Sequence, residues 1–341
     1  MQILSDVEHP KYKQSVTDLG MFQRLEERDA EKVALFLKTP DEDRKSQIEL
    51  ETSIRTKATA ANLPVRLVIK FEVDPEMQIE DAGNRIKGVK NILAVGSGKG
   101  GVGKSTVAAN LAAALSLKGY KVGLIDGDIY GPSIGKLFGV SGRLQLKGDG
   151  KNNIDPHEVK GIKIISFSFL LNPDQAVVWR GPMLGKAIEQ FLFQVNWGPL
   201  DYLILDLPPG TGDVQLSLAQ LIDLDGAIIV TTPQNVALQD ASRAAHMFFE
   251  VKIPVLGVIE NMSGFLCPHC GKTSHIFSKN GAQAFAAKFH IPQLGQIPLQ
   301  ESIMESGEIG LPIVLKEKDG PIAETYFAII EQMNKEIEKF R

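Results

Sequence analysis

The sequence predicts an α/β protein with a mainly parallel sheet covered by helices on both faces, preceded by a small α+β domain. Two observations predict this architecture. From residue 91 onward, short apolar segments alternate with helical patterns. A glycine-rich loop joins the first of these segments to the first helical pattern. Strands that alternate with helices indicate crossover connections, and hence parallel pairing with both sheet faces buried.

Length, composition and charge exclude several classes of protein. The 341 residues suffice for about two domains. The formal net charge is −4, which argues against an electrostatic nucleic-acid binder. The N-terminal residues have no basic segment leading into an apolar core, so we predict no signal peptide. No apolar run approaches the roughly 20 residues of a membrane span, and we expect a cytoplasmic protein without membrane contact.

The first domain is predicted over residues 1–74, followed by a linker at 75–90 and the main domain at 91–341. Strands are expected at 19–25 and 32–37, around a polar turn at 26–29. Thr39 and Pro40 read as a helix start, with a helix to about residue 61 that buries Ile48 and Ile54. A third strand is expected at 65–71.

Parts of this domain resemble the small domain of PaaD/SufT-type iron–sulfur assembly factors. The matching parts are residues 16–21, the segment 37–40 and the helix after it. Those domains often carry a cysteine after the Thr-Pro pair, where this chain has Asp41, Glu42 and Asp43. Without a cysteine or histidine cluster, we expect a docking or regulatory module rather than metal chemistry.

The main domain is predicted to contain seven strands and five intervening helices. The strands are expected at 91–96, 121–125, 162–167, 201–206, 226–231, 254–260 and 292–297. The helices are expected at 103–118, 183–196, 214–222, 235–250 and 280–289. Ligands of such sheets bind at the carboxyl ends of the strands.

The phosphate loop (residues 98–106) is the strongest motif. It matches G-x-x-x-x-G-K-[ST] and has the strand before it and the helix after it that the motif requires. Its backbone N–H groups and the helix N-terminus are predicted to bind the phosphates of ATP. Lys104 would reach the β- and γ-phosphates and Ser105 would bind Mg²⁺. The predicted nucleotide-binding residues of the loop are Gly98, Lys99, Gly100, Gly101, Val102, Gly103, Lys104, Ser105 and Thr106.

A second lysine, Lys99, follows the first glycine of the phosphate loop. Two lysines this close repel one another unless a polyphosphate lies between them. The alternative is a solvated surface lysine.

Acidic residues follow two of the predicted strands. Asp126 and Asp128 come at the end of the second strand, where a Mg²⁺ ion or an activated water would relieve their repulsion. The alternative is an acidic turn capped by Asp126. Asp206 ends an apolar run, the Walker B pattern, and is predicted to hold the magnesium shell. Gly210 and Gly212 would let the next segment move with the γ-phosphate.

Five motifs stand in the order typical of one family. They are the two-lysine loop, 126–133 (DGDIYGPS), 179–183 (WRGPM), 206–213 (DLPPGTGD) and 260–262 (ENM). On these motifs the chain resembles the Mrp/ApbC-type iron–sulfur cluster carriers, within the ParA/MinD-like ATPases with a deviant Walker A loop. The resemblance covers about residues 88–320.

The resemblance implies roles for individual residues. Lys99 would reach the nucleotide of a second subunit, and Asp128 would position the attacking water. Asn261, at the end of the 254–260 strand, would hydrogen-bond the adenine, with a loop-capping asparagine as the alternative. A turn at 296–298 would bring Pro298 against the base.

Cys267 and Cys270 form a C-x-x-C pair and are the two cysteines of the chain. Two thiolates do not complete a tetrahedral sulfur site, so a second subunit must supply the rest. The pair fits a bridging [4Fe–4S] cluster, as the resemblance implies, or a zinc ion held by four thiolates. A redox dithiol and a single-chain zinc site with His269 and His275 are further alternatives.

The resemblance therefore implies a homodimeric carrier with weak ATPase activity that takes a [4Fe–4S] cluster from an assembly scaffold to apo-proteins. One alternative is a zinc-stabilised dimeric ATPase scaffold for complex assembly. Another is a positioning ATPase of the ParA/MinD type bound to DNA or membrane, which the acidic charge balance disfavours.

Residues 321–341 predict a final helix. Its apolar stripe comprises Ile322, Tyr326, Ile329, Ile330, Met333, Ile337 and Phe340. Its polar face mixes glutamate with lysine, whereas a membrane-surface helix is rich in Lys and Arg. We expect it to pack on the sheet.

Overall fold

A computed structural model describes most of the chain. The described residues are 2–10, 15–29, 32–39, 44–61, 63, 66–74, 77, 85–129, 131–142, 144, 146–147, 153–169, 189–212, 215–216 and 221–340. The chain forms two compact units, Met1–Arg85 and Ile86–Arg341. Their boundary lies within the predicted linker at 75–90.

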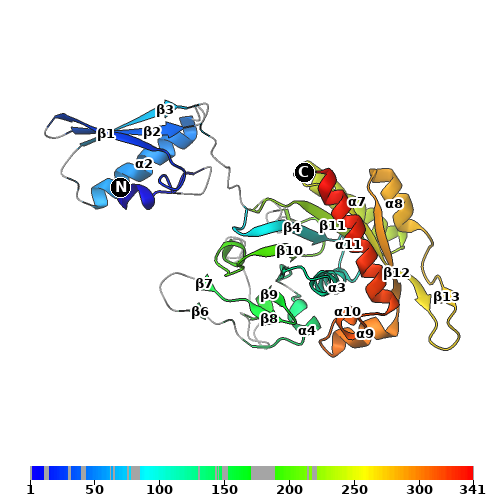
Figure 1. Ribbon diagram of the computed structural model, residues 1–341. Coiled ribbons are helices and arrows are strands. Elements are labelled where there is room, and N and C mark those ends of the chain that lie inside the picture. The colour runs from blue at the N-terminus through cyan, green and yellow to red at the C-terminus, as the bar shows by residue number, and fades with distance from the viewer. Residues whose placement is uncertain are drawn as a thin grey trace. The chain divides into compact units, whose positions relative to one another are not determined.

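The N-terminal unit is a three-stranded sheet with a helix packed on it (Figure 1). β1 pairs antiparallel with β2, and β2 pairs parallel with β3. Alternate side chains of β2, Leu35 and Leu37, meet Leu50 and Ile54 of the helix in one apolar core. The elements are α1 (Gln2–Ser5), β1 (Phe22–Asp29), β2 (Lys32–Thr39), α2 (Arg44–Ala60) and β3 (Arg66–Val73).

Three expectations for this unit are wrong in detail. The predicted turn at 26–29 belongs to β1, which starts at Phe22 rather than residue 19. Thr39 ends β2 and does not cap a helix, and Pro40 lies outside the described residues. Ile48, which was expected to be buried with Ile54, is 64% exposed. The two residues are six positions apart and therefore fall on different faces of the helix, whose core positions are Leu50 and Ile54.

The C-terminal unit is built on a nine-stranded sheet with the order β13-β12-β11-β4-β10-β5-β9-β8, and β14 pairs with β12. The strands from β12 to β9 along this order run parallel, and β13 and β8 run antiparallel to their neighbours. The strands are β4 (Val89–Gly96), β5 (Val122–Asp126), β8 (His157–Val159), β9 (Ile162–Ser166), β10 (Leu200–Asp206), β11 (Gly226–Thr231), β12 (Val255–Leu266), β13 (Thr273–Ser274) and β14 (Gln293–Leu299). A separate two-stranded ribbon is formed by β6 (Leu146–Lys147) and β7 (Asn153–Ile154).

The central strands are buried on both faces, which their continuous apolar runs predict. Helices α3, α10 and α11 pack together, and α7 and α8 form a second packed group against β11 and β12 (Figure 1). The helices are α3 (Lys104–Leu117), α4 (Ile134–Leu137), α7 (Asn235–Glu250), α8 (Gly281–Phe289), α9 (Glu301–Glu308), α10 (Ile313–Lys316) and α11 (Pro321–Lys339), with a 3-10 turn η1 (Phe167–Phe169). The predicted α/β architecture is confirmed.

Other differences concern short or terminal features. The short elements α4, α9, α10, β6, β7, β8 and β13 have too few residues to show a period and were not predicted. Residues 183–188 of the helix predicted at 183–196, residues 214 and 217–220 of the helix predicted at 214–222, and the whole motif 179–183 lie outside the described residues. The stripe of α11 is buried as expected except for Phe340, which follows the helix and is 57% exposed. Among the described residues, every helix is too short or too polar to cross a bilayer.

Candidate functional site

The phosphate loop turns from the end of β4 into α3, and two of its glycines are required there. A Cβ at Gly98 would collide with the backbone of Asp240 and Ala241 in α7. Gly103 has φ of 82°, and a Cβ there would collide with the Asn261 amide. The loop is therefore held closely between α7 and β12.

A hollow of about 190 Å³ lies over the phosphate loop. It brings together both lysines of the loop, the hydroxyls after them and the acid of the next strand end. Its lining residues are Ser97, Lys99, Gly100, Gly101, Gly103, Lys104, Ser105, Thr106, Asp128 and Pro209. Lys99 and Asp128 are half-buried in this hollow, whereas Lys104 is buried.

Lys104 and Asp206 form a buried ion pair at the bottom of the site. The Lys104 Nζ donates to Asp206 Oδ1 at 2.5 Å and, more weakly, to the Ser105 hydroxyl at 3.4 Å. Within the described residues, Asp206 Oδ2 is buried without a partner. Burial raises the pKa of Asp206, and the Lys104 ammonium opposes this rise.

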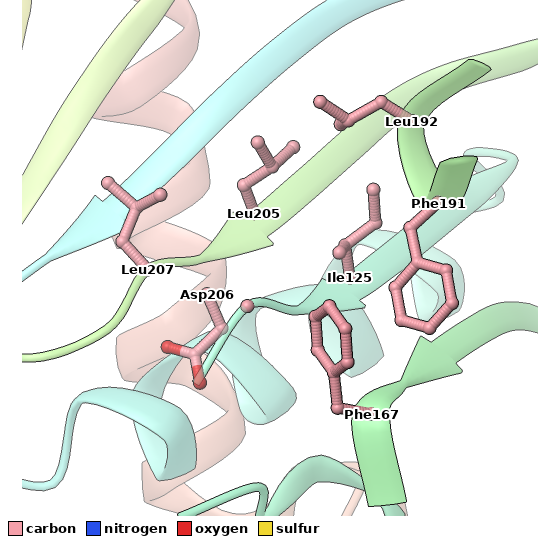
Figure 2. A pocket seen from close by; sticks show the side chains of 8 residues that line it. Ile125, Phe167, Phe191, Leu192, Leu205, Asp206 and Leu207 are labelled. Carbon is pink, nitrogen blue, oxygen red and sulfur yellow. The ribbon is translucent and has the colours of Figure 1, made fainter. Parts of the chain in front are cut away.

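A small apolar cavity of about 10 Å³ explains part of this desolvation. Figure 2 shows Phe167, Phe191 and Leu192 on one side of it, with the Asp206 carboxylate pointing away from them. A volume of this size holds about one water molecule at most. The cavity is therefore too small for a ligand, and its apolar lining keeps water away from this side of Asp206.

Asp126 organises the loop that carries Asp128. Its carboxylate accepts hydrogen bonds from the N–H groups of Asp128, Ser133 and Ile134 and from the Ser166 hydroxyl. These contacts match the capping alternative. Burial, followed by the charge of Asp206, raises the pKa of Asp126 to about 7.

The structure changes the setting of Asn261. It is not at a strand end, because β12 continues to Leu266. Its Nδ2 donates to the carbonyl of Val102 in the phosphate loop at 2.9 Å. Met262 follows with φ of 56°, and the pairing of β12 with β14 shifts register just beyond. The expected turn at 296–298 is also wrong, since Pro298 lies in β14.

The cysteine hairpin (residues 263–275) is the continuation of β12 and its return through β13. Phe265 and Leu266 pair with Ser274 and Thr273, and the Cys267 N–H donates to the Lys272 carbonyl at 3.1 Å. Both cysteines are free thiols; Cys267 is half-buried and Cys270 is exposed. The backbone N–H groups of His269 and Cys270 lower the pKa of Cys267.

One wall of a groove of about 400 Å³ is formed by Cys267. Residues at the start of α9, including Glu301 and Glu305, line the same groove. Among the described residues, no three His, Cys, Asp or Glu side chains come together to hold a metal ion. His275 donates from Nδ1 to the Ser263 carbonyl instead of joining the cysteines.

Four residues near the site were given no role by the sequence alone. Ser166 bonds Asp126, Pro209 lines the hollow, and Glu260 accepts the N–H of Ala282 at the start of α8. Gln215 is buried beside the end of β4. The ENM and DLPPG motifs contain Glu260 and Pro209, whereas Ser166 and Gln215 depend on tertiary contacts.

The residues at the hollow fit a magnesium nucleotide. A serine hydroxyl and a carboxylate are hard oxygen ligands of the kind Mg²⁺ prefers. The unpartnered Asp206 Oδ2 and the Lys104 ammonium offer an acceptor for the metal's water shell and a donor for phosphate.

Comparison with known proteins agrees with this site. Residues 88–334 match the family model of the NUBPL iron-transfer P-loop NTPases of the ParA group. An iron–sulfur cluster carrier protein of Aquifex aeolicus is 43% identical, with 98% of each chain covered. The iron–sulfur cluster transfer protein NUBPL of Dictyostelium discoideum is 46% identical, over 74% of this chain and 78% of its own.

Solved structures give the same result. A nucleotide-binding protein of Archaeoglobus fulgidus in complex with ADP is 36% identical, with a TM-score of 0.61, 71% of this chain covered and 93% of its own. The cell-division ATPase MinD of Pyrococcus furiosus, 21% identical with a TM-score of 0.54, shares the fold over 72% of this chain and 98% of its own. This chain belongs to the NUBPL-type iron-transfer P-loop NTPases of the ParA group.

Proposed function

We propose that this protein is an ATP-dependent iron–sulfur cluster carrier. Two copies would hold one [4Fe–4S] cluster through Cys267 and Cys270 of each chain and pass it to apo-proteins. The observation that carries the proposal is the half-complete thiolate site in a hairpin continuous with the strand that contacts the phosphate loop. The names of the relatives from Aquifex and Dictyostelium support cluster transfer as the purpose.

Residues of the hollow would bind and slowly hydrolyse ATP. When the nucleotide binds, Lys104 would exchange Asp206 for the β- and γ-phosphates, and Ser105 and Asp206 would hold the magnesium ion and its waters. Asp128, fixed by the Asp126 loop, positions the attacking water. Lys99 is half-buried and lines the hollow, and it would reach the nucleotide of the second copy.

The thiolates suit the cargo. The lowered pKa of Cys267 favours the thiolate, the form that binds iron. Cys267 faces a groove rather than a closed core. Because Cys270 is exposed and Cys267 lines an open groove, a recipient's cysteines can replace the carrier's, one sulfur at a time.

Anaerobic reconstitution with metal analysis tests the proposal. We expect about four irons and four sulfides per dimer, lost in both Cys267→Ala and Cys270→Ala. The Cys267→Ala and Cys270→Ala proteins should still bind Mg-ATP, which separates cargo binding from misfolding. Iron and sulfide retained by both variants contradict the carrier. Stoichiometric zinc in protein purified without oxygen favours instead the zinc-stabilised scaffold, whose four-thiolate site has the same ligands.

A further inference from the structure

Gln215 lies on the segment that follows Asp206, and its side chain is 1% exposed. Neither Oε1 nor Nε2 has a hydrogen-bond partner within the part of the chain that the structure describes. Buried amides are almost always paired, because an unpaired one loses its hydration without replacement. This arrangement of Gln215 is therefore an unfavourable one that another state can relieve.

The amide packs directly behind the phosphate loop. A Cβ on Gly96, the last residue of β4, would lie 3.1 Å from the Gln215 Nε2 and 3.0 Å from the ring of Phe248. Gly96 is two residues before Gly98. The amide thus lies between the end of β4 and Phe248 of α7, next to the start of the phosphate loop.

The segment carrying Gln215 is tied to both halves of the nucleotide site. The N–H of Leu207 donates to the Val95 carbonyl, and the N–H of Gly210 donates to the Ser97 carbonyl at 3.0 Å. Gly210 has φ of 96°, and a Cβ on Gly212 would meet nothing within 4 Å. A movement of Asp206 or of the start of the phosphate loop would therefore also move the segment after Asp206. That segment has room to move, because there is open space around Gly210 and Gly212.

We propose that Gln215 is a nucleotide-sensing positioning residue: its amide is unpartnered in the nucleotide-free protein and gains partners when Mg-ATP shifts the described residues after Asp206, 207–212 and 215–216. The free-energy cost of the unpartnered amide is present only in the nucleotide-free protein. Losing this cost on binding therefore favours the nucleotide-bound state. This inference rests on the proposed nucleotide site.

The substitution Gln215→Met tests it, because it keeps the length of the side chain and removes both polar groups. We expect the Tm of the nucleotide-free protein to rise by about 3 °C or more. The affinity for Mg-ATP should fall about tenfold, and the Mg-ATP-induced rise in Tm should shrink. The matched control is Gln293→Met on β14, where the buried amide nitrogen also has no partner among described residues; its response to nucleotide should stay unchanged.

Each outcome is decisive. A lower Tm in the nucleotide-free Gln215→Met protein overturns the inference, as does a higher Tm with an unchanged response to Mg-ATP. If the unmodified protein shows no rise in Tm with Mg-ATP, the nucleotide site itself fails and the inference with it. Hydrogen exchange in the unmodified protein gives a test without substitution. Residues 207–212 and 215–216 should change protection with Mg²⁺ and a non-hydrolysable ATP analogue, and equal protection overturns the inference.

Discussion

The phosphate loop and the cysteine hairpin differ in how firmly one chain builds them. The loop is fixed by close backbone contact with α7, by the Asn261 amide and by the ion pair of Lys104 with Asp206. The hairpin has a two-residue strand, a few backbone hydrogen bonds and two exposed or half-exposed thiols. The contrast suits their proposed tasks, since phosphate binding needs a preformed cradle and cargo exchange needs accessible ligands.

The largest expected effect is on the buried ion pair. Lys104→Ala leaves Asp206 charged and unpaired in a dry site, so we expect the free energy of unfolding to fall by about 3–5 kcal/mol. Mg-ATP binding should be lost as well. Lys99→Ala, in the same loop but half-exposed, is the matched control and should change stability by less than about 0.5 kcal/mol. Urea unfolding measures both, and equal losses would remove the distinction between the two lysines.

The next effect is pH-dependent and belongs to Asp126. Its pKa is raised from 3.8 to about 7, so the folded protein keeps a proton that the unfolded chain has released. Stability of the nucleotide-free protein should therefore fall as pH rises from about 4 to about 7, and then level off. Asn cannot ionise, so Asp126→Asn should abolish this fall in stability. The midpoint of urea unfolding, measured across this pH range, checks the prediction.

Asp201→Asn serves as the control for that titration. Lys90 and the Lys121 N–H lower the pKa of Asp201, so its contribution to stability disappears only as pH falls through the acidic range below about 4. The slope between pH 4 and 7 should persist in Asp201→Asn. A fall that also persists in Asp126→Asn would assign it to another group.

A smaller effect is expected where the two regions meet. Asn261→Ala removes the donor to the Val102 carbonyl and should cost about 1–2 kcal/mol. It should also weaken Mg-ATP binding, because Gly103 loses its neighbour. Ser263→Ala, two residues on, removes a 3.2 Å bond to the Ile297 carbonyl and should leave nucleotide affinity unchanged. Isothermal titration separates them, and equal affinities in all three proteins would deny any link between β12 and the loop.

The smallest effect concerns reactivity alone. In the Cys270→Ala protein, alkylation of Cys267 by iodoacetamide should have its midpoint below the pH typical of a free thiol, because backbone N–H groups stabilise the thiolate. Denatured protein provides the reference. Identical midpoints in the folded and denatured states would contradict this local stabilisation.

Sequence alone predicted the long elements of the C-terminal unit, because their apolar periods span enough residues to be distinctive. It did not predict that β12 continues past Asn261. The apolar run ends there, and the left-handed backbone at Met262 bends the strand without ending it. The residues of the phosphate loop follow from local motif chemistry. Ser166 and Gln215 act through neighbours distant in sequence, and no local pattern marks them.

The placement of Pro298 has a consequence for how copies of this protein can meet. It lies in β14, which pairs with β12 and, among the described strands, with no other. Proline offers no N–H to an incoming strand, and the outermost strands β13 and β8 have only two and three residues. The sheet is thus protected against growing by edge-to-edge addition, so aggregation through its margins is suppressed while association through loops stays open.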